Sequence, residues 1–150
     1  MDPIEDEDRD PIERRDQHAF EYTMHEGQGP LSVEHHFAAG SELTVAVQTW
    51  TLGVGAFEGM HAHDDPPLEE IYLVTEGRAR VRQDGEAYEL DPGDSFRSPA
   101  GTPHDLANIG EVPLRVVVIW GPPGIFDKSS FGSYLRALDA RRPTDPGERP

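Results

Sequence analysis

The 150-residue sequence contains no cysteine, so it can form neither a disulfide nor a thiolate metal site, and it has no cysteine nucleophile. No apolar run approaches the ~20 residues that a membrane-spanning helix needs. The acidic N-terminus also lacks the positive and apolar regions of a signal peptide. We therefore expect a soluble, cytoplasmic protein in which any metal is held by histidine and carboxylate.

Positive charge is also scarce, because the 13 basic residues include a single lysine, Lys128, and face 29 acidic residues for a net charge of −16. Nucleic acids and anionic membranes are polyanions, so neither is expected as a partner. The sequence also lacks a glycine-rich nucleotide loop and a nucleophile elbow, which argues against an organic cofactor. A small molecule is the expected substrate.

The length suits one domain, and composition divides the chain into three parts. Residues 1–17 carry eight acidic and three basic residues with almost nothing apolar, which predicts a disordered arm. Residues 18–126 hold the predicted β-domain. Residues 127–150 are predicted to form a short helix, capped by Ser129 or Ser130 and running to about Ala140, followed by a frayed tail.

The central part is predicted to form many short strands separated by turns that contain glycine and proline. The segments rich in alternating or β-branched residues are 42–52, 71–74, 78–83, 87–90, 95–97 and 112–120. Phe20 with Tyr22, and Leu31 with Val33, suggest two further short edge strands. This pattern predicts an all-β sandwich or barrel.

Two separated stretches carry the candidate metal ligands. His61 and His63 are two residues apart in a strand-like segment, so their side chains are expected on one face, and Glu70 follows them. His104 stands at the start of a later strand, after a proline-rich turn. We hypothesise that these four residues converge on one divalent metal, for which Fe, Mn, Ni, Zn, Co and Cu all suit imidazole and carboxylate ligands.

Other polar and aromatic residues receive plainer interpretations. The remaining histidines are expected to be surface or hydrogen-bonded residues: His18, His25, His35 and His36. Residues beside the motifs are candidates for pocket walls, with core packing as the default for the apolar ones: Trp50, Met60, Tyr72, Phe96 and Arg97. Arg80 and Arg97 either pair with a substrate carboxylate or offset the acidic surface.

The two stretches resemble the paired motifs of the cupin superfamily. The first family motif, G-x5-HxH-x3,4-E-x6-G, matches Gly55, His61, His63, Glu70 and Gly77. The second, G-x5-P-x-G-x2-H-x3-N, matches Gly93, Pro99, Gly101, His104 and Asn108. Six residues, Asp64 to Glu69, separate His63 from Glu70 where the family has three or four. The spacing to Gly77 selects Glu70 as the ligand, with Glu69 as the alternative.

The resemblance implies a jelly-roll barrel with one divalent metal held by three histidines and one glutamate. It also implies a homodimer in which residues 18–40 lend edge strands to the partner. A metal that only stabilises the fold is the plainer alternative. Three neutral imidazoles and one carboxylate leave a charge of +1 around a divalent ion, which favours an anionic or enolisable substrate.

The resemblance implies a metal-dependent oxidoreductase of the dioxygenase kind that acts on a small oxygenated organic substrate. Two alternatives stay open from the sequence. One is a non-redox isomerase, lyase or polyketide-cyclase-type enzyme in which the metal is a Lewis acid. The other is a non-catalytic module that binds a small ligand. The sequence assigns no catalytic residue beyond the metal ligands.

Overall fold

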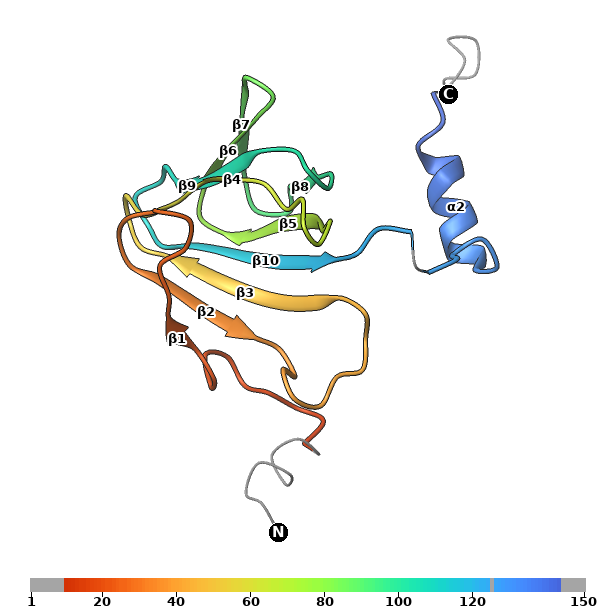
Figure 1. Ribbon diagram of the computed structural model, residues 1–150, viewed down its shortest axis with the longest axis horizontal. Helices are drawn as coiled ribbons and strands as arrows, with labels where there is room; N and C mark the ends of the chain where they lie inside the picture. The colour runs from red at the N-terminus through yellow and green to blue at the C-terminus, as the bar shows by residue number, and fades with distance from the viewer. Residues whose placement is uncertain (1–9, 125, 144–150) are drawn as a thin grey trace.

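The computed structural model describes residues 10–124 and 126–143, which form two antiparallel sheets that face each other, followed by one helix (Figure 1). The first sheet has the order β1-β2-β3-β10-β5-β8 and the second has the order β4-β9-β6-β7. The first sheet contains β1 (Phe20–Glu21), β2 (Leu31–His35), β3 (Ala46–Leu52), β10 (Leu114–Gly121), β5 (Glu69–Glu76) and β8 (Ser95–Ser98). The second contains β4 (Phe57–His61), β9 (His104–Asn108), β6 (Ala79–Gln83) and β7 (Glu86–Leu90). The chain crosses repeatedly between the sheets, so the predicted jelly-roll fold is confirmed.

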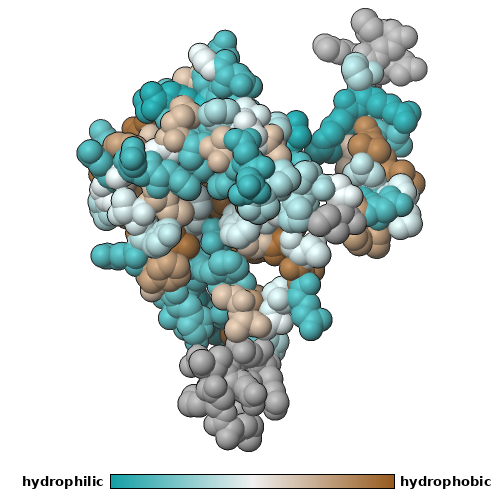
Figure 2. All heavy atoms as spheres, in the orientation of Figure 1, coloured by the Kyte–Doolittle hydropathy of each residue, from teal (hydrophilic) through white to brown (hydrophobic). Residues whose placement is uncertain are grey.

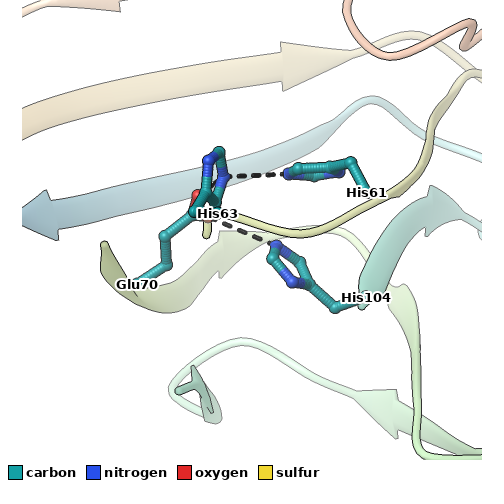
Figure 3. Close-up of side chains that lie close together, drawn as sticks. All are labelled: His61, His63, Glu70 and His104. Atoms are coloured by element: carbon teal, nitrogen blue, oxygen red, sulfur yellow. Dashed lines mark hydrogen bonds and ion pairs between the residues drawn. The ribbon is translucent and has the colours of Figure 1, made fainter. Parts of the chain in front are cut away.

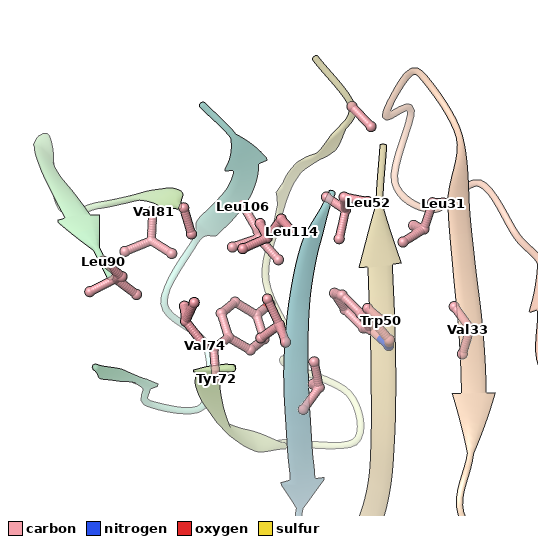
Figure 4. Close-up of a cluster of buried hydrophobic side chains, with 14 residues drawn as sticks. Leu31, Val33, Trp50, Leu52, Tyr72, Val74, Val81, Leu90, Leu106 and Leu114 are labelled. Carbon is pink, nitrogen blue, oxygen red and sulfur yellow. The ribbon is translucent and has the colours of Figure 1, made fainter. Parts of the chain in front are cut away.

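The hydrophobic core lies between the two sheets (Figure 4). Period-two alternation builds it: Tyr72 and Val74 of β5 are buried, whereas Ile71 and Leu73, which alternate with them, are exposed. Tyr72 and Trp50 contact each other with ring centroids 5.8 Å apart. Val81 of β6 approaches the same layer from the second sheet. Burial of these side chains holds the sheets together around the interior space in which the candidate site lies.

The boundaries of two predicted elements differ in the structure. The strand expected over 42–52 begins at Ala46, and Leu43 is exposed. The helix α2 spans Gly132–Ala140 with Phe131 at the N-cap, so the predicted serine cap is wrong. The Ser129 hydroxyl donates to Oδ1 of Asp127 instead, at 2.6 Å. Ser129 and Ser130 lie before the N-cap position, so neither of them caps the helix.

Helix α2 stands away from the sheets and buries none of its residues (Figure 1). Apolar atoms are visible on it in Figure 2, and its exposed apolar residues include Leu135 and Leu138. Within the described ranges, no helix is long and apolar enough to cross a membrane. Phe20 and Tyr22 at the β1 edge are also exposed, and homodimer formation through this region stays a prediction.

The first part of the predicted acidic arm, residues 1–9, lies outside the described residues, and the rest contacts the barrel. The Arg15 guanidinium donates two hydrogen bonds to the Glu76 carboxylate, at 2.9 and 3.2 Å. Oε1 of Glu13 accepts a hydrogen bond from the backbone N–H of Phe37, at 2.7 Å. Residues 10–17 therefore lie against the barrel, and the domain limits at 17/18 and 126/127 stay predictions.

Candidate metal centre

Both sheets contribute to the candidate centre (Figure 3). His61 ends β4 and His104 begins β9, and the two residues pair directly across the antiparallel strands. Glu70 is the second residue of β5, in the opposite sheet. His63 follows β4, and its carbonyl accepts a hydrogen bond from the N–H of Gly101 at 3.1 Å, which ties the two motifs together. The structure thus brings all four predicted residues to one place.

The donor atoms of these four residues all lie within 4.8 Å of one another. Nε2 of His61 is 3.1 Å from Nε2 of His63, and Nε2 of His104 is 3.6 Å from Oε2 of Glu70. Nε2 of His63 also contacts Oε1 of Glu70. Two ligands bound at right angles with bonds of about 2.1 Å are about 3 Å apart. The His61–His63 distance equals this spacing, and the His104–Glu70 distance is close to it.

Hydrogen bonds on the far side of two rings fix their tautomers. Nδ1 of His61 donates to the carbonyl of Gly59 at 2.9 Å, and Nδ1 of His104 donates to the carbonyl of Thr102 at 3.0 Å. A carbonyl oxygen only accepts, so the proton is on Nδ1 and the Nε2 lone pair faces the cluster. This is the arrangement by which outer groups orient histidine ligands toward a metal.

The ionisation states of His61 and Glu70 suit metal binding. Burial lowers the pKa of His61 to about 4, so this ring is neutral near pH 7. Burial alone would raise the pKa of Glu70, but the neighbouring His104 and Tyr72 side chains and the charge of His63 outweigh it and lower the pKa. Burial alone would lower the pKa of His104, yet the Glu70 carboxylate and the Thr102 carbonyl raise it. Glu70 is therefore a carboxylate beside its histidines.

Some donor atoms of the cluster lack protein partners. Within the part of the chain that the structure describes, Nε2 of His104 and Oε2 of Glu70 are buried and have no hydrogen-bond partner. Buried polar atoms are almost always paired, and an unpaired one calls for a bound ion or water. Together with the three imidazoles and one carboxylate, these atoms fit a divalent transition metal.

Glu70, which the motif spacing selects as the ligand, points into the centre, whereas the alternative, Glu69, does not. Glu70 is 4% exposed and shares its strand face with Tyr72, whereas Glu69 faces outward and approaches Arg97 at 3.8 Å. The extra residues before Glu69 form a loop closed by a bridge between Asp64 and Pro67. The longer spacing is thus absorbed ahead of β5, and Glu70 lies within the cluster.

The proposed wall residues separate into two groups. Tyr72 is fully buried, with its ring centroid 5.8 Å from that of His104, and Trp50 packs in the core behind it. Met60 is 52% exposed and faces outward, and the Arg97 side chain is 62% exposed. Tyr72 is therefore a wall residue of the candidate centre, next to His104.

The sequence interpretation missed two residues beside the centre, Glu58 and His25. The imidazole of His25, expected to be a surface or hydrogen-bonded residue, stacks on His61 with ring centroids 3.6 Å apart and planes 6° apart. Glu58 is fully buried, and its Oε1 lies 3.0 Å from Nε2 of His61. Burial, followed by the charge of Glu70, raises the pKa of Glu58 to about 9. These residues and His61 form a second set of donor atoms within 4.8 Å of one another.

Comparison with known proteins gives a family and several fold neighbours. The sequence profile described as "Cupin domain" matches residues 48–120. An uncharacterised protein of Methanocaldococcus jannaschii, MJ1618, is 40% identical over 70 residues, which are 47% of this chain and 54% of that protein. The chain therefore matches about half the length of this curated relative.

Solved structures share the fold at lower identity. A protein of Thermotoga maritima described as a predicted oxalate decarboxylase has a TM-score of 0.64 and 20% identity over 69% of this chain and 91% of its own. The Cupin_2 domain of an XRE family transcriptional regulator from Enterobacter cloacae has a TM-score of 0.55 and 21% identity over 63% and 98% of the two chains. The paired motifs, the two-sheet fold and the matched profile show that this chain contains a small domain of the cupin superfamily.

Proposed function

We propose that this protein is a divalent-metal-dependent oxidoreductase that acts on a small oxygenated organic substrate in the manner of a dioxygenase. The observation that carries the proposal is the convergence of His61, His63, Glu70 and His104, with buried donor atoms that lack any other partner among the described residues. When bound, the metal would supply Lewis acidity and, for a redox-active ion, electron transfer to and from oxygen.

The residues of the chain set what such a centre can bind. Neutral His61, the other two imidazoles and the Glu70 carboxylate give a divalent ion a local charge of +1, which attracts an anionic or enolisable substrate. Four protein ligands leave up to two positions of an octahedral ion for substrate oxygens and O2. Tyr72 lines the interior next to His104 and helps exclude bulk water.

The first test is metal content. Elemental analysis of the purified protein is expected to find one transition metal per chain, and His104→Ala is expected to lose it. His35→Ala is the matched control, because His35 contacts Trp120 and belongs to neither cluster of donor atoms. A protein that retains one metal per chain after replacement of His104 would contradict the assignment of the centre.

The second test concerns the reaction. Protein reconstituted separately with Fe(II), Mn(II), Ni(II) or Zn(II) is mixed with small hydroxy acids, dicarboxylates, phenols and diketones while oxygen uptake is recorded. We expect uptake with a redox-active ion and none with Zn(II). Turnover that continues undiminished without oxygen, and that Zn(II) supports fully, would overturn the oxidoreductase proposal in favour of Lewis-acid isomerase or lyase chemistry.

A further inference from the structure

Gln83, the last residue of β6, lies beside the candidate metal centre. The register pairs it directly with His104 of β9. Residues paired in this way have side chains on the same face of a sheet, with Cβ atoms about 5 Å apart. Along β6, Gln83 also follows the buried residues Ala79 and Val81 at a spacing of two. Its side chain therefore faces the barrel interior, as that of His104 does.

Gln83 belongs to a polar row that crosses the inner face of the second sheet. The register pairs His61 with His104, His104 with Gln83, and Gln83 with Glu86. Exposure falls along this row toward the centre, because Glu86 is exposed, Gln83 is half-buried and His104 is 1% exposed. The polar row thus leads from the surface at the β6–β7 hairpin to the ligand histidines.

A line of aromatic rings runs toward the same histidine. Tyr88 of β7 is exposed, Phe96 of β8 is half-buried and Tyr72 of β5 is fully buried. Ring centroids are 6.5 Å apart between Tyr88 and Phe96, 5.9 Å between Phe96 and Tyr72, and 5.8 Å between Tyr72 and His104. The polar row and the aromatic line both end at His104, so the interior beside the centre offers polar groups together with ring surfaces.

The amide of Gln83 has an unused acceptor. Its Oε1 is buried and has no hydrogen-bond partner within the part of the chain that the structure describes. A buried acceptor without a partner lowers stability, and such atoms are normally paired with protein, ligand or water. An amide oxygen accepts hydrogen bonds, so it suits a hydroxyl group that lies next to the metal position.

The charges around Gln83 disfavour an anionic group at this place. Asp84 follows it directly, and Glu86 is its partner across the hairpin. The guanidinium of Arg82, which could offset these carboxylates, is bound to Asp105, with Nε donating to Oδ2 at 2.7 Å. The part of a ligand beside Gln83 is therefore expected to be neutral, whereas the part at the metal is expected to be anionic.

We propose that Gln83 is a specificity-determining residue that binds a neutral hydroxyl of the substrate while a carboxylate and a neighbouring oxygen of the same molecule bind the metal. The inference rests on the proposed function and names hydroxylated monocarboxylic acids as its substrate class. Oε1 of Gln83 accepts the hydroxyl hydrogen. A site of this kind discriminates against an acid that lacks the hydroxyl, because the buried amide oxygen is then left unpaired.

The experiment measures binding of lactate and glycerate to Co(II)-loaded protein by calorimetry without oxygen, with both enantiomers of each acid. The two acids share a carboxylate and a 2-hydroxyl for the metal, and glycerate has one more hydroxyl on its third carbon. Wild type is expected to bind glycerate about fivefold more tightly than lactate, as one further neutral hydrogen bond provides.

The variants are Gln83→Leu, Gln83→Glu and Gln28→Leu, each checked for folding by circular dichroism. Gln83→Leu should bind glycerate and lactate within about twofold of each other, because leucine has no acceptor. Gln83→Glu should keep the preference for glycerate, because a carboxylate also accepts the hydroxyl hydrogen. Gln28→Leu is the control, since Gln28 is exposed and outside the polar row, and it should behave as the wild type.

The possible failures are separable. A Co(II)-loaded wild type without the preference, or a folded Gln83→Leu variant that retains it, would mean that water occupies the amide oxygen, and would overturn this inference alone. A Gln83→Leu variant that binds Co(II) at least about tenfold more weakly would make Gln83 a support of the metal centre and would also overturn it. A folded wild type that binds no divalent metal would remove the proposed function and this inference together.

Discussion

Replacing Asn108 should destabilise the barrel more than any other exchange of a neutral polar side chain in the second motif. The residue ends β9 and is 5% exposed. Its Nδ2 lies within hydrogen-bond distance of the carbonyl oxygens of Leu52, Gly53 and Val112, at 3.1, 3.1 and 2.9 Å. Its Oδ1 accepts from the N–H of Gly110 at 2.9 Å. One side chain thus joins the end of β3 to the turn before β10.

The magnitude follows from these contacts. A side-chain amide has two N–H donors, so Asn108 makes two full bonds to the three carbonyls and accepts one more. Three bonds at a net value of about 1 kcal/mol each predict that Asn108→Ala lowers the free energy of unfolding by about 3 kcal/mol. For a chain of this length, that loss lowers the melting temperature by roughly 6–12 °C.

Urea unfolding of chelator-treated protein, followed by circular dichroism, measures this difference. Asn108→Asp should destabilise the protein at least as much, because a carboxylate cannot donate to the three carbonyls. The control is Thr75→Ala, which removes one exposed bond to the carbonyl of Arg115 and should change stability by no more than about 0.5 kcal/mol. An Asn108→Ala variant as stable as this control would refute the assignment of Asn108 as the link between these turns.

Three further predictions concern the centre and the loop that covers it. A divalent metal at 100 times its dissociation constant should stabilise the fold by about 2.7 kcal/mol, seen as a higher melting temperature that His104→Ala abolishes. In chelator-treated protein, folding raises the pKa of Glu58 from 4.5 to about 9. Between these two values the folded state therefore keeps a proton that the unfolded state has lost. The stabilisation that this proton gives to the folded state is complete below pH 4.5 and is lost as the pH rises toward 9. Urea midpoints across this window should fall with pH more steeply in the wild type than in Glu58→Gln, and equal slopes would contradict the prediction. Gly59→Ala should destabilise the protein by about 1–3 kcal/mol because its Cβ overlaps the His25 carbonyl. Gly132→Ala, with open space around it, is the control, and equal urea midpoints would refute the argument.

The sequence predicted the convergence of the site because its spacing and the strand period agree. His61 and His104 come from separate motifs, yet antiparallel pairing of β4 with β9 sets them directly opposite each other. Glu70 lies two residues before buried Tyr72 in the same strand, so both side chains face inward, whereas Glu69 faces outward. Alternation along the strands was also sufficient to predict an all-β fold, because one face of most strands is buried and the other is not.

Features that depend on one local irregularity were not predictable in the same way. Period-two alternation places Glu58 on the face opposite to His61, and the bulge that reverses this carries no distinctive residue apart from Gly59. His25 precedes His61 by more than thirty residues, and its contact with the ring depends on the close approach of two loops. The helix start was misplaced because Phe131 at the N-cap makes no side-chain capping bond, so the start of the helix carries no signal in residue type.

Residues of the candidate centre and its surroundings also weaken the fold. Five buried side-chain atoms around the centre have no hydrogen-bond partner within the described ranges: both carboxylate oxygens of Glu58, Oε2 of Glu70, the hydroxyl of Tyr72 and Nε2 of His104. Each such atom lowers stability by about 1–3 kcal/mol compared with a paired one. A cation held by His61, His63, Glu70 and His104 would satisfy Oε2 of Glu70 and Nε2 of His104, and its binding would then be coupled to folding. A barrel that needed only to be stable would place apolar residues here, as it does throughout the layer around Val81 and Leu106.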